Sequence, residues 1–138
     1  MSTRVFIDSN VIVYANDARD PAKRKRAAEL IARHMREGTG VVSTQVLQEY
    51  ASVALAKLNQ EDSILLRMLR LLEALTVVQT TPLLIRRAVE LRKVHNVGFW
   101  DATILAAAEE ADCGILLSED FNPGQYYGGI RVQNPFAG

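Results

Sequence analysis

The sequence has little of what a disulfide or a soft-metal site needs. Cys113 is the only cysteine, and His34 and His95 are the only histidines, in a chain of 138 residues. A disulfide within the chain needs two cysteines, and structural zinc sites need several cysteine or histidine ligands. The sequence therefore excludes an intramolecular disulfide and a cysteine-rich zinc site, and it argues against a histidine-rich metal site.

A net charge of either sign is also lacking. Sixteen Lys and Arg residues balance sixteen Asp and Glu residues, and the pI is near 6.7. Nucleic-acid binding through overall positive charge is therefore excluded, so any basic contact has to be local. The one dense basic stretch is Lys23-Arg24-Lys25-Arg26, close to Arg19. Such a run could hold RNA phosphates, although a run of charges more often marks a solvated helix face.

Long apolar runs are absent as well. No segment has the length and purity of a membrane span, and Arg4 and Asp8 interrupt the first apolar stretch, which argues against a signal peptide. Apolar residues make up 49% and charged residues 23%, as is usual for a folded globular chain. We therefore expect a cytoplasmic protein with a single domain spanning residues 1–138.

What the sequence does contain is a regular alternation of strand-like and helix-like segments. Asp20-Pro21 and Thr81-Pro82 are helix starts, and Gly38 is a helix stop. Strands are predicted at 5–7, 40–43, 77–78, 115–117 and 131–132, and helices at 10–15, 21–37, 44–58, 61–75, 83–95 and 99–110. This order predicts an α/β fold with a mostly parallel sheet and helices on both faces.

Four acidic residues are placed where such a fold brings chemistry together. Asp8 ends the first strand and Asp120 follows the fourth, so both belong at the carboxyl edge of a parallel sheet. Glu49 lies on the helix after the second strand, at the boundary of its apolar stripe. Asp101 shares a helix face with apolar residues such as Leu105, which predicts an inward-pointing carboxylate in the first helical turn.

Converging carboxylates repel one another unless a cation lies between them. No Lys or Arg is close to these acids in sequence, although Arg4 or Arg131 could approach from a distance. Carboxylate oxygens suit Mg²⁺ or Mn²⁺, and such an ion fits phosphodiester hydrolysis. Taken singly, each acid is more often an ordinary turn, cap or surface residue than a catalytic one, and only their joint placement favours a metal site.

The same residues resemble a known family, the PIN domains. Four ordered motifs carry the resemblance, which runs from residue 4 to 136: residues 6–14 (FIDSNVIVY), 43–50 (STQVLQEY), 99–108 (FWDATILAAA) and 116–121 (LLSEDF), followed by Gly124-Gln125 and Asn134-Pro135-Phe136. The compact length is similar to that of VapC-type toxins of prokaryotic toxin–antitoxin pairs. The resemblance implies a three-layer α/β/α PIN-like fold.

The resemblance also implies an activity, a metal-dependent endoribonuclease. By motif position, Asp8, Glu49, Asp101 and Asp120 become the catalytic ligands of Mg²⁺ or Mn²⁺. Asn10 and Ser118 match polar positions that orient those acids, and Ser118 replaces the threonine that is frequent in the family. The implied reaction is in-line attack by a metal-activated water on an RNA phosphodiester.

The implied partners are an RNA substrate such as tRNA or ribosomal RNA, a cognate antitoxin and a second copy of the chain. The helix predicted at 61–75 carries more apolar residues than one buried stripe needs, notably Ile64 and Leu66. We expect an antitoxin or dimer contact there, with burial between neighbouring helices as the alternative. Trp100, beside Asp101, is open to two interpretations, base stacking or packing.

Two enzymatic alternatives each lack a residue. A response-regulator receiver needs a lysine after its last strands, and no lysine follows Lys93. A haloacid-dehalogenase-type phosphatase needs an aspartate two residues after the first, where this chain has Asn10. A third alternative is a catalytically silent PIN-like module that binds RNA or acts as a scaffold. Loss of one or more acids would signal it, and all four are present.

Overall fold

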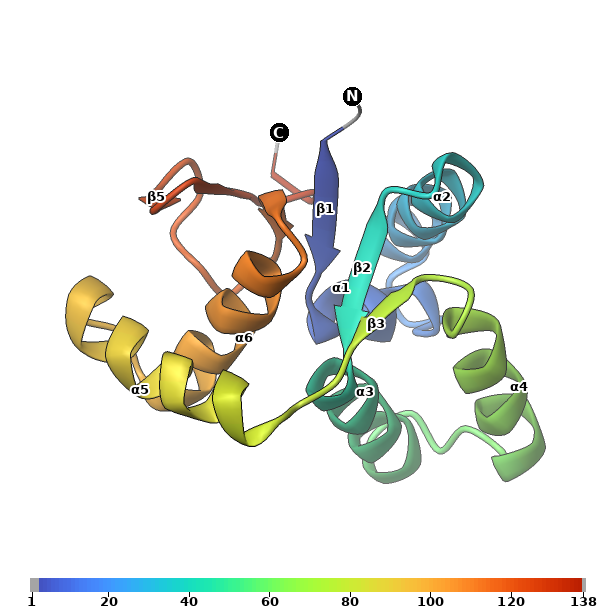
Figure 1. Ribbon diagram of the computed structural model, residues 1–138. Coiled ribbons are helices and arrows are strands. Elements are labelled where there is room, and N and C mark those ends of the chain that lie inside the picture. The colour runs from blue at the N-terminus through green and yellow to red at the C-terminus, as the bar shows by residue number, and fades with distance from the viewer. Residues whose placement is uncertain (1–2, 138) are drawn as a thin grey trace.

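The computed structural model describes residues 3–137, which are built around one six-stranded sheet (Figure 1). The strands are β1 (Arg4–Ile7), β2 (Gly40–Ser43), β3 (Thr76–Val78), β4 (Cys113–Leu117), β5 (Tyr126–Tyr127) and β6 (Ile130–Gln133), in the spatial order β3-β2-β1-β4-β6-β5. Every neighbouring pair is parallel except β5 with β6. The strand order changes direction at β1, between β2 and β4, and this is where an open parallel sheet places its ligands.

Six helices connect and cover the strands: α1 (Ser9–Ala15), α2 (Pro21–Glu37), α3 (Thr44–Ala56), α4 (Asp62–Leu72), α5 (Pro82–His95) and α6 (Phe99–Glu110). Helices α5 and α6 pack together on one side of the sheet, and α1 and α2 lie on the other (Figure 1). Helix α3 packs against α1, and α4 packs against α3. The predicted three-layer α/β/α architecture is confirmed.

Short-range signals in the sequence explain where the helices begin and end. Asp20 caps α2 by accepting a hydrogen bond from the backbone N–H of Lys23, and Thr81 caps α5 in the same manner. Gly38 ends α2 in the left-handed region at φ 68°, which glycine adopts without a steric penalty.

The core lies on both faces of the sheet. The strands contribute fully buried apolar side chains, Phe6 and Ile7 from β1, Val41 from β2 and Leu116 from β4. Burial on both faces explains why these strands are continuously apolar rather than alternating. Among residues 3–137, no helix is long and apolar enough to cross a membrane.

The structure refines the predicted elements mainly at their ends. Helix α4 stops at Leu72 rather than residue 75, and β6 extends the predicted fifth strand to 130–133. The strand β5 was not predicted, because its two residues carry too little pattern to be recognised. It forms by antiparallel pairing of Tyr126 with Arg131 and of Tyr127 with Ile130.

Candidate active site

The carboxyl edge of the parallel strands is where the predicted acids gather. Asp8 directly follows β1, and Ile7 pairs in register with Leu117 at the end of β4. Because the next residues on these strands are Asp8 and Ser118, the pairing sets them side by side. Ser43 ends β2 and caps α3, the helix that carries Glu49. Strand register and helix capping therefore bring distant parts of the chain to one edge of the sheet. We call this edge the acidic rim, after the side chains of Asp8, Glu49, Asp101 and Asp120.

Asp8 is the buried centre of this rim, with 5% of its surface exposed. One of its oxygens accepts from the backbone N–H of Ser9 at 2.7 Å, and the other accepts from the Ser118 hydroxyl at 2.7 Å. The Ser118 Oγ in turn accepts from Asn10 Nδ2 at 3.2 Å and from the backbone N–H of Asp120 at 3.1 Å. One hydroxyl thus uses its single donor and both acceptor positions to join β1 to the loop after β4.

Asn10 makes the second connection across the same gap. Its Nδ2 donates to Asp120 Oδ2 at 3.1 Å and lies 3.5 Å from Asp8 Oδ2. Its Oδ1 accepts from the backbone N–H of Glu119 at 3.2 Å. An amide that offers a donor and an acceptor to one loop fixes both the position and the direction of that loop.

Glu49 and Asp101 complete the rim from the helices, and both are exposed. The prediction that Asp101 points inward is wrong. The buried part of α6 begins one residue later, at Ala102, and includes Leu105 and Ala108. A helical wheel gives direction around the axis but not position along it, and the first turn of α6 lies beyond the edge of the core.

The four acids influence one another electrostatically. Burial raises the pKa of Asp8 most, and the charges of Asp120 and Asp101 raise it further. Although its side chain is exposed, the carboxyl group of Glu49 is partly desolvated, which raises its pKa most, and the charges of Asp8, Asp120 and Asp101 raise it further. Partial desolvation and then the charge of Asp120 raise the pKa of Asp101. Each of these three carboxylates is therefore harder to ionise than an isolated one, first because it is partly or fully desolvated and then because like charges lie nearby.

Basic side chains are directed elsewhere. Among residues 3–137, the ion pairs involve other acids and none of these four. Arg4 donates to the carbonyl of Ala111 and to Thr76, at the opposite edge of the sheet. Arg131 lies on β6, opposite Ile115 and Tyr126.

The chemistry of this donor set fits a hard divalent cation. Carboxylate oxygens are the ligands that Mg²⁺ and Mn²⁺ prefer. Within the described residues, no group of three or more Asp, Glu, His or Cys side chains is placed so that it could hold a metal ion by itself. An open arrangement suits Mg²⁺, which usually keeps several waters and binds through one or two carboxylates together with substrate phosphates.

Two further polar residues at the rim were missed by the sequence reasoning. Gln45, one helical turn before Glu49 on α3, lowers the pKa of the Glu49 carboxyl group against the larger effect of lost hydration, which raises it. Gln45 also accepts a hydrogen bond from the Thr103 hydroxyl on α6. The spacing of four residues between Gln45 and Glu49 was a usable signal, but the partnership with Thr103 required the fold.

Comparison with known proteins agrees with this geometry. A family model described as PIN domain matches residues 5–127. The chain belongs to the PIN domain family. No curated protein sequence matches this PIN domain.

Solved structures resemble this PIN domain over most of its length. VapC20 of Mycobacterium tuberculosis, described as a toxin that cleaves the sarcin-ricin loop, is 21% identical, with 84% of this chain and 91% of that chain covered and a TM-score of 0.67. A toxin–antitoxin complex from Klebsiella pneumoniae is 20% identical, with 96% and 98% covered and a TM-score of 0.69. DNA-bound VapBC from Salmonella typhimurium is 14% identical, with 97% and 99% covered and a TM-score of 0.69. At these identities the likeness shows a shared fold.

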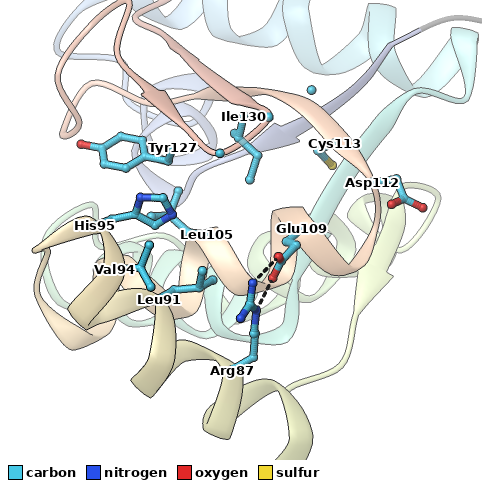
Figure 2. A pocket seen from close by; sticks show the side chains of 13 residues that line it. Arg87, Leu91, Val94, His95, Leu105, Glu109, Asp112, Cys113, Tyr127 and Ile130 are labelled. Carbon is cyan, nitrogen blue, oxygen red and sulfur yellow. Dashed lines mark hydrogen bonds and ion pairs between the residues drawn. The ribbon is translucent and has the colours of Figure 1, made fainter.

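A pocket of about 560 Å³ lies away from the acidic rim of the PIN domain, between α5, α6 and the turn that joins β5 to β6 (Figure 2). Arg87 and Glu109 face each other at one end of it, with two hydrogen bonds of 2.7 and 2.8 Å. Cys113 also lines it, and burial raises the pKa of this thiol to about 12. Because Glu109 is paired with Arg87 and the Cys113 thiol stays protonated, neither side chain is a candidate catalytic group, in contrast to the acids of the rim.

Proposed function

We propose that this PIN domain is a metal-dependent endoribonuclease, the toxin of a toxin–antitoxin pair. One observation carries the proposal. Four carboxylates from four separate segments share the carboxyl edge of the sheet, and three of them have pKa values raised by burial and by the others. Gathered and partly desolvated carboxylates oppose folding unless their charge is balanced, and a ligand of positive charge would balance it.

Each acid has a place in the proposed site. Asp8, Glu49, Asp101 and Asp120 would supply the carboxylate oxygens for the divalent cation, Mg²⁺ or Mn²⁺. When bound, such a cation lowers the pKa of a coordinated water and offsets negative charge on the phosphodiester. Asn10 and Ser118 do not touch the substrate in this proposal. They hold Asp8 and Asp120 in register through the hydrogen bonds described above.

The open rim suits a large polyanionic substrate. Three of the four acids are exposed, and only Asp8 is buried. An RNA backbone could therefore approach the rim without a lid having to move. Trp100, next to Asp101, is 69% exposed and is available to stack an unpaired base. Structured RNAs such as tRNA or ribosomal RNA are the proposed class of target.

The proposed protein partners are a cognate antitoxin and a second copy of the chain. Solved relatives from Klebsiella pneumoniae and Salmonella typhimurium are toxin–antitoxin complexes, which supports this assignment. Helix α4 leaves Ile64 44%, Leu66 64% and Leu71 52% exposed, so its apolar residues exceed what the core covers. We place an antitoxin or dimer contact on this helix.

The experiment is cleavage of total cellular RNA by the purified protein with Mg²⁺, with Mn²⁺ and with EDTA. Asp101→Asn is the test variant, and Glu109→Gln is the matched control, because it also replaces a carboxylate of α6. Cleavage that needs the metal, persists in Glu109→Gln and disappears in Asp101→Asn supports the proposal. A protein free of antitoxin that binds RNA but cuts none of it under any condition is instead the silent RNA-binding module.

A further inference from the structure

The basic run that begins at Lys23 has a use that its sequence does not reveal. Lys23 lies in the first turn of α2, where its backbone N–H is held by the capping Asp20. Its Nζ donates to Glu119 Oε1 at 2.8 Å, across 96 residues of sequence. Glu119 is the residue between Ser118 and Asp120. The lysine expected to hold RNA phosphates therefore binds the loop that carries an acid of the rim.

Aromatic rings enclose this ion pair. The Lys23 Nζ lies 4.5 Å from the centroid of the Tyr14 ring and 5.3 Å from that of Phe136, and it also lies 3.3 Å from the Tyr14 hydroxyl. The two rings meet edge to face at 4.9 Å. The Lys23 and Glu119 side chains are 29% and 30% exposed. Partial burial and cation–π contact strengthen a charge pair that would contribute little on an open surface.

The ion pair with Lys23 and a backbone hydrogen bond to Asn10 hold Glu119 from two sides. Lys23 binds its carboxylate, and Asn10 Oδ1 accepts from its backbone N–H at 3.2 Å. Asp120 is the next residue. Its backbone N–H donates a hydrogen bond to Ser118 Oγ, and its carboxylate accepts one from Asn10 Nδ2. A shift of Glu119 therefore moves both hydrogen bonds that position Asp120. Lys23 also neutralises a fifth acid at the edge of a site that already gathers four.

We propose that Lys23 is a positioning residue of the acidic rim, one that fixes Glu119 and, through it, the carboxylate of Asp120. The inference rests on the proposed function, since it assigns Lys23 a part in forming the cation site. Residues that orient metal ligands typically contribute about 10- to 100-fold in metal affinity. Lys23 is then needed for the geometry of the site, although it touches neither metal nor RNA.

The test compares Lys23→Met, which keeps an apolar stem and removes the ammonium, with Lys25→Met as the control. Lys25 is an exposed lysine of the same helix, two residues further on. The first measurement is Mn²⁺ affinity by calorimetric titration. We expect Lys23→Met to weaken Mn²⁺ binding by about tenfold and Lys25→Met to change it by less than about twofold. Lys23→Arg keeps a positive charge at this position and should retain most of the wild-type affinity.

A double-mutant cycle separates positioning from a general charge effect. Glu119→Gln should weaken Mn²⁺ binding about as much as Lys23→Met, and the double variant should add little, because both substitutions break the same contact. If Lys23 instead acted on the cation through its charge alone, it would repel it. Lys23→Met would then tighten Mn²⁺ binding while Glu119→Gln weakened it, so the two changes would have opposite signs. Additive effects, opposite effects or an unchanged affinity in Lys23→Met would overturn the proposal.

A second measurement does not depend on the metal. Amide hydrogen exchange followed by NMR reports directly on the Glu119 N–H, which is bonded to Asn10 in the native protein. Lys23→Met should speed amide exchange at Glu119 and Asp120 by about tenfold or more. In the same variant, amides in the core of β4 should keep their wild-type exchange rates. In Lys25→Met, all amides should keep their wild-type exchange rates. Unchanged exchange at these two amides would refute the positioning role. If the wild-type protein bound no Mn²⁺, the proposed function would fail while exchange still decided the role of Lys23.

Discussion

The two ends of α6 carry carboxylates that behave in opposite ways. Asp101 lies in the first turn, where the helix dipole favours negative charge, yet burial and the charge of Asp120 raise its pKa. Glu109 lies in the last turn, where the dipole disfavours negative charge, yet hydrogen bonds from Arg87 lower its pKa. At both ends the direction of the pKa shift is opposite to the one that the helix dipole alone would give. The comparison separates an acid that the fold pairs with a basic side chain, Glu109, from one that has no ion pair among residues 3–137, Asp101.

The largest expected difference between the two ends is in RNA cleavage. Asp101→Asn should lower the cleavage rate by at least about 100-fold, more than most substitutions that act through another residue. Glu109→Gln should leave the rate within about twofold, because Glu109 pairs with Arg87 away from the rim. Single-turnover cleavage in saturating Mg²⁺ measures both, with circular dichroism to verify the fold. Equal losses in the two variants would contradict the assignment of the site to the rim.

Cation binding tests the difference between Asp101 and Glu109 without any substrate. A divalent ion at one hundred times its dissociation constant should stabilise the folded protein by about 2.7 kcal/mol, because it binds the native state only. Thermal unfolding with and without Mn²⁺ measures this gain, which should persist in Glu109→Gln and be lost in Asp101→Asn. A gain of the same size in Asp101→Asn would place the cation elsewhere.

Removing a charge from the rim should stabilise the metal-free protein. Asp8 is buried with its pKa raised, so its ionised form opposes folding when no cation is present. Asp8→Asn in EDTA should add about 1 kcal/mol to the free energy of unfolding, as active-site substitutions often do at the expense of function. Denaturant unfolding measures the change. A destabilised variant would mean that the hydrogen bonds to Ser9 and Ser118 depend on the charge of the carboxylate.

Asp8, whose pKa is raised, and Glu109, whose pKa is lowered, should affect the pH dependence of folding stability in opposite directions. Above 3.8 and up to its raised native pKa, Asp8 binds more protons in the folded than in the unfolded state, so its effect is to lower stability as pH rises. Glu109 has a lowered native pKa, so its contribution is present above 4.5 and is lost as pH falls through that pKa. Melting temperatures in EDTA between pH 3 and pH 7 should show the advantage of Asp8→Asn growing with pH.

The smallest expected effect is the stability lost in Glu109→Gln at neutral pH. Its pair with Arg87 is well formed but partly solvated, with side chains 42% and 44% exposed, and such pairs stabilise weakly. The melting temperature should fall by less than it rises in Asp8→Asn, and the difference should shrink in 1 M salt. A decrease that is large and independent of salt would show that Glu109 has a packing role as well.

Most of the fold could be predicted from local signals. Helices that start at Asp20-Pro21 and Thr81-Pro82 were identified because capping residues act within one turn. Strand β5 was missed because Tyr126 and Tyr127 form a strand only by pairing with β6. For two residues without a pattern of their own, tertiary context decides the structure.

The site was predicted less completely than the fold, for the same reason. Asp8 and Asp120 could be placed at one rim because each follows a strand directly. The exposure of Asp101 could not be read from a helical wheel, and the pairing of Lys23 with Glu119 spans 96 residues. Contacts at such a separation leave no trace in a single sequence when neither residue interrupts its local pattern.

The register of β1 with β4 has a consequence for synthesis of the chain. Asp8 meets Ser118 only when Ile7 has paired with Leu117, and the pairing of Leu117 with Gln133 adds the last support. A ribosome makes Asp8 and Glu49 well before the loop with Asp120. The four acids therefore cannot share one edge of the sheet until β4, the loop after it and β6 have left the ribosome.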